Sequence, residues 1–262
     1  YMLTEVEVNM LSKVRKAFGK LIVLLNVGNV IDMSFMDKYN PDAVLYVWQG
    51  GMTGGKAVAQ VLTGEAYPSG KLTDTIAYAI EDYPSHSNFG GLERNIYAED
   101  IYVGYRYFET VAKDKVRYPF GFGLSYTEFE IKPVSFNRDK DSICLEVEVA
   151  NSGGSKGKEV VQVYFEAPQG LLGKPARSLV AFAKTRELMP GETQTIKFSI
   201  NISDLASYDD SGITGHKSCY LLEAGEYRLY VGNNVRDTKE AGSFTLDEII
   251  VTERLSEAMA PV

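Results

Sequence analysis

The sequence predicts an α/β fold followed by an all-β fold, in which a partial parallel α/β sandwich precedes an antiparallel β-sandwich. Three observations support this. Apolar strand patterns alternate with helix patterns over residues 4–64. After residue 126, apolar residues recur at every second position in several short stretches. Between these regions, residues 102–126 concentrate aromatic side chains and glycines around Arg106.

A helix is predicted at the start of the chain, over residues 4–18. Thr4 and Glu7 have the spacing of a capping box, and Gly19 stands where glycine commonly ends a helix. Residues 21–25 then form a continuous apolar run. Such a run is typical of a parallel strand that is buried on both faces of its sheet.

The next stretch repeats this alternation. Residues 34–39 predict a short helix, and residues 43–48 a second buried strand. A glycine-rich turn follows at residues 50–55, and residues 56–62 predict another helix. Because two strands are too few to complete a parallel sheet, we expect its other strands to precede Tyr1 in a larger polypeptide.

The second half of the chain has the pattern of a β-sandwich. Its apolar positions alternate with polar ones, and turn sequences separate the stretches. The alternating residues are Ile143, Leu145, Val147 and Val149; Val161, Val163 and Phe165; Ile196, Phe198 and Ile200; and Tyr227, Leu229 and Val231. The last residues, 252–262, have the pattern of a charged helical start or a linker rather than of a strand.

The composition excludes several classes of protein. The content of 45% hydrophobic and 24% charged residues is that of an ordinary globular chain, and no run of about 18 apolar residues predicts a membrane span. A net charge of −8 disfavours a nucleic-acid partner, since phosphate backbones attract basic surfaces. Cys144 and Cys219, without a C-x-x-C motif, exclude a disulfide scaffold and a thiolate zinc site. Whether these two cysteines are bonded to each other stays open, and we expect no metal and no cofactor.

The glycine-rich turn at residues 50–56 has the spacing of a phosphate-binding loop, G-x-x-x-x-G-K. However, Ala57 stands where such a loop needs a Ser or Thr hydroxyl to hold Mg²⁺. The plainer interpretation is a tight turn from strand to helix, in which glycines allow the backbone to approach closely.

Longer motifs resemble a known family. Residues 48–64, with their aromatic, glycine pair and helix, continue without a gap into Pro68-Ser69-Gly70-Lys71-Leu72. Residues 102–126 and the stretches 151–164, 179–192 and 225–232 of the second half match the same family. Together these motifs resemble the C-terminal part of the α/β-sandwich domain and the fibronectin type III-like domain of glycoside hydrolase family 3 β-glucosidases.

The resemblance implies a domain organisation and a reaction. Residues 1–125 would be the C-terminal part of the α/β-sandwich domain, 126–249 the fibronectin type III-like domain, and 250–262 a linker towards a (β/α)8 barrel outside this sequence. The parent enzyme would be a retaining β-glucosidase that hydrolyses terminal β-D-glucosyl residues, with two carboxyl groups about 5–5.5 Å apart. In the family the nucleophile is an Asp in the barrel, and the acid/base is a Glu in a loop ahead of the helix predicted at residues 4–18. Both are expected outside this chain, so no catalytic residue is assigned to it.

This chain would then supply scaffold and one wall of the cleft. Ligands of open α/β sheets lie at the carboxyl ends of the strands. Residues 26–29 and 48–52 occupy these positions, and Trp48, Gln49 and Met52 are the candidate substrate-binding residues. The alternative is a non-catalytic carbohydrate- or protein-binding module, although the chain contains a single Trp and glycan-binding platforms usually need several.

Partners and location follow from the same resemblance. The expected partners are a β-glucoside or cello-oligosaccharide and the missing barrel domain, with no nucleic acid and no membrane; a homo-oligomer is compatible with the sequence. Residues beyond the sandwich suggest the inverted order, in which the barrel follows it. Such enzymes are familiar from anaerobic gut bacteria, which favours a bacterial, cytoplasmic protein.

The aromatic segment carries one structural expectation. Tyr105, Tyr107, Phe120 and Tyr126 are expected to be largely buried where the α/β part meets the sandwich, because so many large rings would not be left in water together. Arg106 is expected to be hydrogen-bonded nearby.

Overall fold

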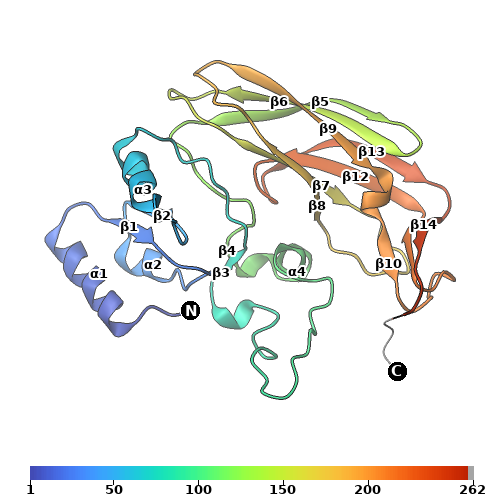
Figure 1. Ribbon diagram of the computed structural model, residues 1–262, viewed down its shortest axis with the longest axis horizontal. Helices are drawn as coiled ribbons and strands as arrows, with labels where there is room; N and C mark the ends of the chain where they lie inside the picture. Colours follow the sequence, from blue (N-terminus) through green and yellow to red (C-terminus); the bar gives the residue numbers. More distant parts are fainter. Residues whose placement is uncertain (259–262) are drawn as a thin grey trace.

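The computed structural model describes residues 1–258. It has an α/β part and a larger β-sandwich, with helix α4 lying between them (Figure 1). The α/β part contains α1 (Glu5–Ala17), β1 (Ile22–Leu25), α2 (Phe35–Tyr39), β2 (Ala43–Tyr46), α3 (Gly54–Thr63), β3 (Ile76–Ala77), η1 (Ile80–Asp82), α4 (Tyr105–Val111), η2 (Lys113–Lys115) and β4 (Val116–Tyr118).

Strands β1 and β2 form a parallel pair, as the sequence predicts, in a register that places Ile22 beside Ala43. The capping box of α1 is present, since the Glu7 N–H donates to Thr4 Oγ1 and the Thr4 N–H donates back to the Glu7 carboxylate. The expectation that β1 is buried on both faces is wrong for this chain. Leu21 and Leu25 are buried, but Ile22 and Leu24 are 54% and 43% exposed. The reason is that α1 and α2 pack on only one side of this strand.

The β-sandwich consists of antiparallel sheets, as predicted from the alternation. One sheet has the order β5-β6-β9, the second β13-β12-β7-β8, and a small third sheet β10-β11-β14. The elements are β5 (Phe129–Arg138), β6 (Ser142–Asn151), β7 (Val160–Glu166), β8 (Ser178–Lys184), β9 (Thr193–Asn201), η3 (Ile202–Leu205), β10 (Ser207–Asp209), β11 (Cys219–Leu222), β12 (Gly225–Gly232), β13 (Thr238–Leu246) and β14 (Ile250–Arg254).

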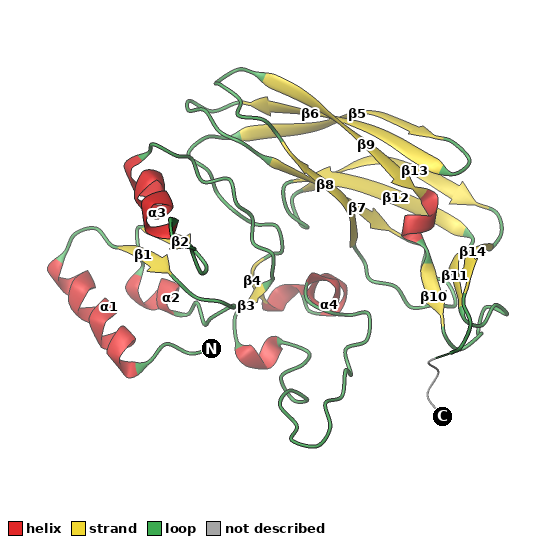
Figure 2. Cartoon of the chain, in the orientation of Figure 1, coloured by secondary structure: helices red, strands yellow, loops and turns green. Residues whose placement is uncertain are grey.

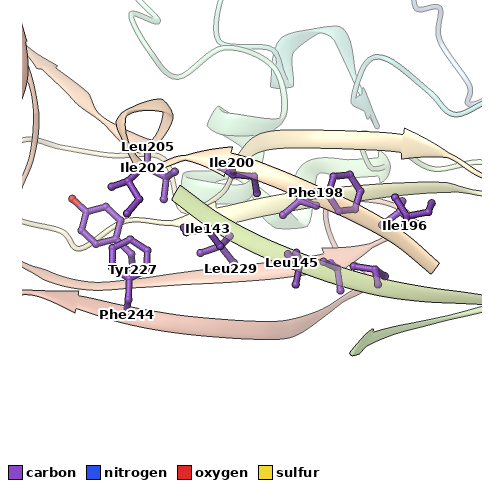
Figure 3. Close-up of a cluster of buried hydrophobic side chains, with 14 of the residues drawn as sticks. Ile143, Leu145, Ile196, Phe198, Ile200, Ile202, Leu205, Tyr227, Leu229 and Phe244 are labelled. Carbon is purple, nitrogen blue, oxygen red and sulfur yellow. The ribbon is translucent and has the colours of Figure 1, made fainter. Parts of the chain in front are cut away.

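The core of the sandwich lies between the two large sheets (Figure 3). Ile143, Leu145 and Leu229 are wholly buried there, and the rings of Tyr227 and Phe244 stack with their centroids 5.1 Å apart. These residues occupy alternate positions of their strands. The apolar periodicity of the sequence therefore predicted correctly which face of β6, β9 and β12 would be buried.

The end of the chain differs from the prediction. Residues 250–254 are not a linker or a helical start but strand β14, which pairs antiparallel with β11. All five of its residues are exposed. Since neither face is buried, the strand has no apolar periodicity, and only its backbone hydrogen-bond ladder defines it. Residues 259–262 of the expected linker lie outside the described residues.

The two parts meet on the segment 120–123. The Gly121 N–H donates to the Leu72 carbonyl, and the Leu72 N–H donates to the Phe122 carbonyl, both at 2.8 Å. On the other side, the Val235 N–H donates to the Phe120 carbonyl at 3.1 Å. This segment is therefore joined by backbone hydrogen bonds to both parts of the molecule.

The aromatic rings of residues 102–126 are less buried than expected. Tyr105, Tyr107 and Phe120 are only half-buried, and Tyr126 is 49% exposed. The wholly buried ring is that of Phe108, because it lies on the side of α4 that faces the core formed with Val116 and Ala77.

Arg106 is exposed, and its guanidinium makes no hydrogen bond to any other residue within 1–258, so the expected hydrogen bond is not found there. The rings nevertheless cross the junction: Tyr105 stacks on Phe120 with centroids 4.6 Å apart, and it meets Tyr164 of the sandwich edge-on. The aromatic rings of residues 102–126 lie at the junction of the two parts, as predicted, but they are less buried than predicted.

The two cysteines are free. Cys144 lies on the exposed face of β6, whereas Cys219 is buried in β11. The structure thus resolves the question that the sequence left open.

Candidate functional site

Two loops meet at the carboxyl ends of β1 and β2, where the sequence places the candidate site (Figure 2). Gln49 is exposed, and its side-chain amide lies so close to Gly28 that a Cβ there would be 3.0 Å from Gln49 Nε2. A larger residue at position 28 would displace this amide. The structure therefore brings Gln49 together with the loop that follows β1.

Trp48 has an unusual backbone. It is half-buried, and its φ of 53° lies in the left-handed region that bulky residues rarely adopt. This conformation ends β2 at Tyr46, two residues earlier than the sequence predicts. Strained conformations of this kind persist where the surroundings impose them, and they cluster at functional sites.

Tyr46 is a member of this site that the sequence analysis missed. Its ring lies against Trp48 with the centroids 4.5 Å apart, and its hydroxyl donates a 2.6 Å hydrogen bond to the carbonyl of Asn29. Burial, together with the negative charge of Asp74, raises the pKa of Tyr46 to about 12, so the hydroxyl stays a donor at neutral pH. The sequence feature that could have identified Tyr46 is its position near the carboxyl end of a predicted strand.

Met52 is at the outer limit of this site. It is fully exposed, on the turn that leads to α3. An exposed apolar side chain beside polar loops suits a surface that another part of a protein or a ligand covers. The structure brings Gln49 and the Tyr46 hydroxyl to the loop after β1, packs Trp48 against Tyr46, and leaves Met52 fully exposed.

The glycine-rich turn has a packing role in this structure. A Cβ on Gly50 would lie 2.9 Å from the Cα of Gly54, so the turn needs glycine at position 50. Lys56 is exposed on α3. The close approach to Gly54 accounts for the glycine at position 50 without a phosphate ligand.

The region of residues 1–258 contains no group of three or more His, Cys, Asp or Glu side chains suited to a metal ion. None of its helices is both long and apolar enough to cross a bilayer.

Comparison with known families decides the identity of this fold. Residues 1–126 match the glycosyl hydrolase family 3 C-terminal domain, and residues 159–235 match the fibronectin type III-like domain. The chain is a glycosyl hydrolase family 3 C-terminal domain followed by a fibronectin type III-like domain. The resemblance seen in the sequence motifs, including the partial α/β sandwich and the fibronectin type III-like sandwich, is confirmed.

Individual β-glucosidases are similar over the whole chain or nearly all of it. A β-glucosidase of Ruminococcus albus is 56% identical over 262 residues, which are 28% of its own length. Beta-glucosidase A of Butyrivibrio fibrisolvens is 44% identical, and the match covers 34% of it. The crystal structure of a β-glucosidase from Paenibacillus barengoltzii superposes with a TM-score of 0.96 at 52% identity, over 99% of this chain and 29% of that one. The chain thus spans about a third of the length of these relatives or less.

Proposed function

We propose that this chain is part of a retaining β-glucosidase that removes terminal β-D-glucosyl residues, and that it supplies scaffold and one wall of the active-site cleft. The observation that carries the proposal is the 56% identity to a β-glucosidase over the entire chain, without a part left unmatched. Structures of β-glucosidase 3B from Thermotoga neapolitana contain bound glucose, and they superpose with a TM-score of 0.87.

Trp48, Gln49 and Met52 are the residues proposed to face the sugar. Their support is the position of Trp48 and Gln49 at the carboxyl edge of β1 and β2, together with the left-handed backbone of Trp48. The Trp48 ring would stack on the apolar face of a glucosyl unit, and the Gln49 amide would hydrogen-bond a hydroxyl. Tyr46 would hold the Trp48 ring in place.

The exposed face of β1 agrees with a chain that works within a larger polypeptide. Ile22 and Leu24 are large apolar residues that a complete α/β sandwich would cover. The proposed partners are accordingly the barrel domain and the glucoside substrate.

The experiment is Trp48→Ala in the complete enzyme, assayed on cellobiose and on nitrophenyl β-glucoside. We expect kcat/KM to fall about tenfold, the equivalent of one lost stacking contact. Lys56→Ala is the control, because Lys56 is exposed on the following helix, and it should change kcat/KM by less than about twofold. Equal kcat/KM values for the Trp48 variant and the Lys56 control would contradict the proposal that these residues line the cleft wall.

A further inference from the structure

A cleft at the junction of the two parts has an unusual charge for this acidic chain. It has a volume of about 290 Å³ and is lined by Glu109, Lys113, Arg177, Val235 and Arg236. Three of these five residues are cationic and one is anionic. The chain as a whole carries a net charge of −8, so the cleft is a local positive site on a negative protein.

The two arginines are held in position. Arg236 Nε donates to the buried carboxylate of Glu109 at 2.8 Å, and its Nη2 donates to the Lys113 carbonyl at 2.8 Å. The Cζ atom of Arg177 lies 3.4 Å from the centroid of the Tyr230 ring. Arg177 Nη1 also donates one long hydrogen bond to Thr238 Oγ1. Fixing a guanidinium in this way lowers the entropy lost when it binds an anion.

The positive charge is not neutralised by the surrounding carboxylates. Glu109 pairs with Arg236, and among the described residues no carboxylate lies within ion-pair distance of Lys113 or Arg177. Glu166 accepts a hydrogen bond from the Tyr230 hydroxyl instead, and neither Asp114 nor Asp237 lines the cleft. Two cations therefore face the cleft without a counter-ion.

The lining comes from both parts of the molecule. Glu109 and Lys113 lie at the end of α4 and in η2, whereas Arg177 precedes β8 and Arg236 lies in the turn between β12 and β13. A ligand with several acceptor oxygens would contact cations from both parts at once.

We propose that this cleft binds a phosphate group, as inorganic phosphate or as the monoester of a small sugar, and that binding joins the α/β part to the sandwich. A phosphate offers several acceptor oxygens and between about one and two negative charges at neutral pH, which suit two unpaired cations on separate elements. The cleft is separate from the edge that carries Trp48, so this proposal stands independently of the proposed glucosidase site.

The test is calorimetric titration of the complete chain with inorganic phosphate, and separately with glucose 6-phosphate, at constant ionic strength. We expect saturable binding below about 10 mM phosphate, and a melting temperature that rises with phosphate but not with the same ionic strength of chloride. Tighter binding of the ester would identify a sugar phosphate as the ligand, and equal binding would identify the phosphate group alone.

Variants assign the binding to this cleft. Lys113→Gln and Arg177→Gln should each weaken binding about tenfold, and Arg177→Lys should retain part of it. Lys197→Gln, on the exposed face of β9, is the matched control and should leave the affinity unchanged. No saturable heat with the unaltered chain, or equal affinities for the cleft variants and the control, would overturn the proposal.

Discussion

Asp209 shows how one residue can organise a turn. Its wholly buried carboxylate accepts hydrogen bonds from the N–H groups of Gly212, Ile213 and Thr214, and from the hydroxyls of Ser211 and Thr214. Burial acts to raise the pKa of Asp209, but the bonds from Thr214, Gly212 and Ser211 outweigh it and lower the pKa to about 2.

This pKa has a consequence for stability. An unfolded Asp has a pKa of about 3.9, so Asp209 stabilises the fold above that pH, and the contribution is lost as the pH falls towards 2. We expect Asp209→Asn to lower the melting temperature at pH 7, with a difference from the unaltered chain that shrinks between about pH 4 and pH 2. The exposed neighbour Asp210→Asn is the control. A pH-independent difference would mean that the carboxylate charge has no part in the effect.

Gly123 and Gly70 form a matched pair at the junction. A Cβ on Gly123 would lie 2.4 Å from the carbonyl oxygen of Gly70, whereas a Cβ on Gly70 would have no neighbour within 4 Å. Gly123→Ala should therefore destabilise the chain by about 1–3 kcal/mol through overpacking. Gly70→Ala should change stability by less than about 1 kcal/mol. Denaturant unfolding of both variants measures this, and equal effects would contradict the close approach.

At the scale of elements, α4 packs its aromatic residues at unequal depth. Phe108 is wholly buried and meets Tyr83 edge-on with centroids 5.5 Å apart, whereas Phe120, beyond the helix, is half-buried. We expect Phe108→Ala to cost about 3–5 kcal/mol, and Phe120→Ala to cost less because part of its ring already contacts water. Chemical denaturation of the two variants decides this, and a larger loss for Phe120 would show that stacking on Tyr105 matters more than burial.

The burial of β7 also belongs to this scale. The sequence placed Gln162 and Tyr164 on the polar face of that strand, yet both are buried. They face Gly121 and Tyr105 from the α/β part, and Gln162 Nε2 donates to the Asn233 carbonyl at 2.7 Å. A strand can thus alternate correctly in sequence and still be covered on both faces by a neighbouring domain.

At the scale of the molecule, a buried ion pair links the two parts. Lys71 Nζ lies 2.8 Å from Glu159 Oε1 and also donates to the Gly123 carbonyl at 3.0 Å; the two side chains are 11% and 7% exposed. Lys71 belongs to the motif Pro68-Ser69-Gly70-Lys71-Leu72 that supported the family resemblance. The pair gives this lysine a structural role at the junction.

Removing one partner should uncouple the two parts. Glu159→Ala leaves a buried lysine without its counter-ion, which should cost about 3–5 kcal/mol and broaden or split the calorimetric unfolding transition. Lys156→Ala removes a lysine from the exposed pair with Glu187 and should cost less than about 1 kcal/mol. A single sharp transition in the Glu159 variant would show that the junction is held by other contacts.

The activity of the isolated chain is a further prediction at this scale. No catalytic residue is assigned to it, and the proposed enzyme needs an Asp and a Glu from other segments. We expect the purified 262-residue chain to release no nitrophenol from nitrophenyl β-glucoside above the rate of a buffer control. Turnover that follows the chain through purification would place a catalytic pair within it.

The sequence by itself determined the fold class, the family resemblance and the buried faces of β6, β9 and β12. Local rules are sufficient there, because apolar alternation at Ile143 and Leu145 and the capping box at Thr4 depend only on neighbouring residues. The position of Trp48 and Gln49 near the carboxyl end of β2 was predictable for the same reason, although the strand ends two residues earlier than its apolar pattern indicates.

Only the tertiary structure decided which side chains meet across the chain. The contact of Lys71 with Glu159, the junction cleft with Arg177 and Arg236, and the depth of Phe108 all join residues that are distant in sequence or depend on the opposing surface. Strand β14 was not predicted, because its side chains are exposed on both faces and backbone hydrogen bonding does not determine the residue types. Burial and long-range pairing depend on two surfaces that meet in the fold. A single segment of sequence supplies only one of these two surfaces.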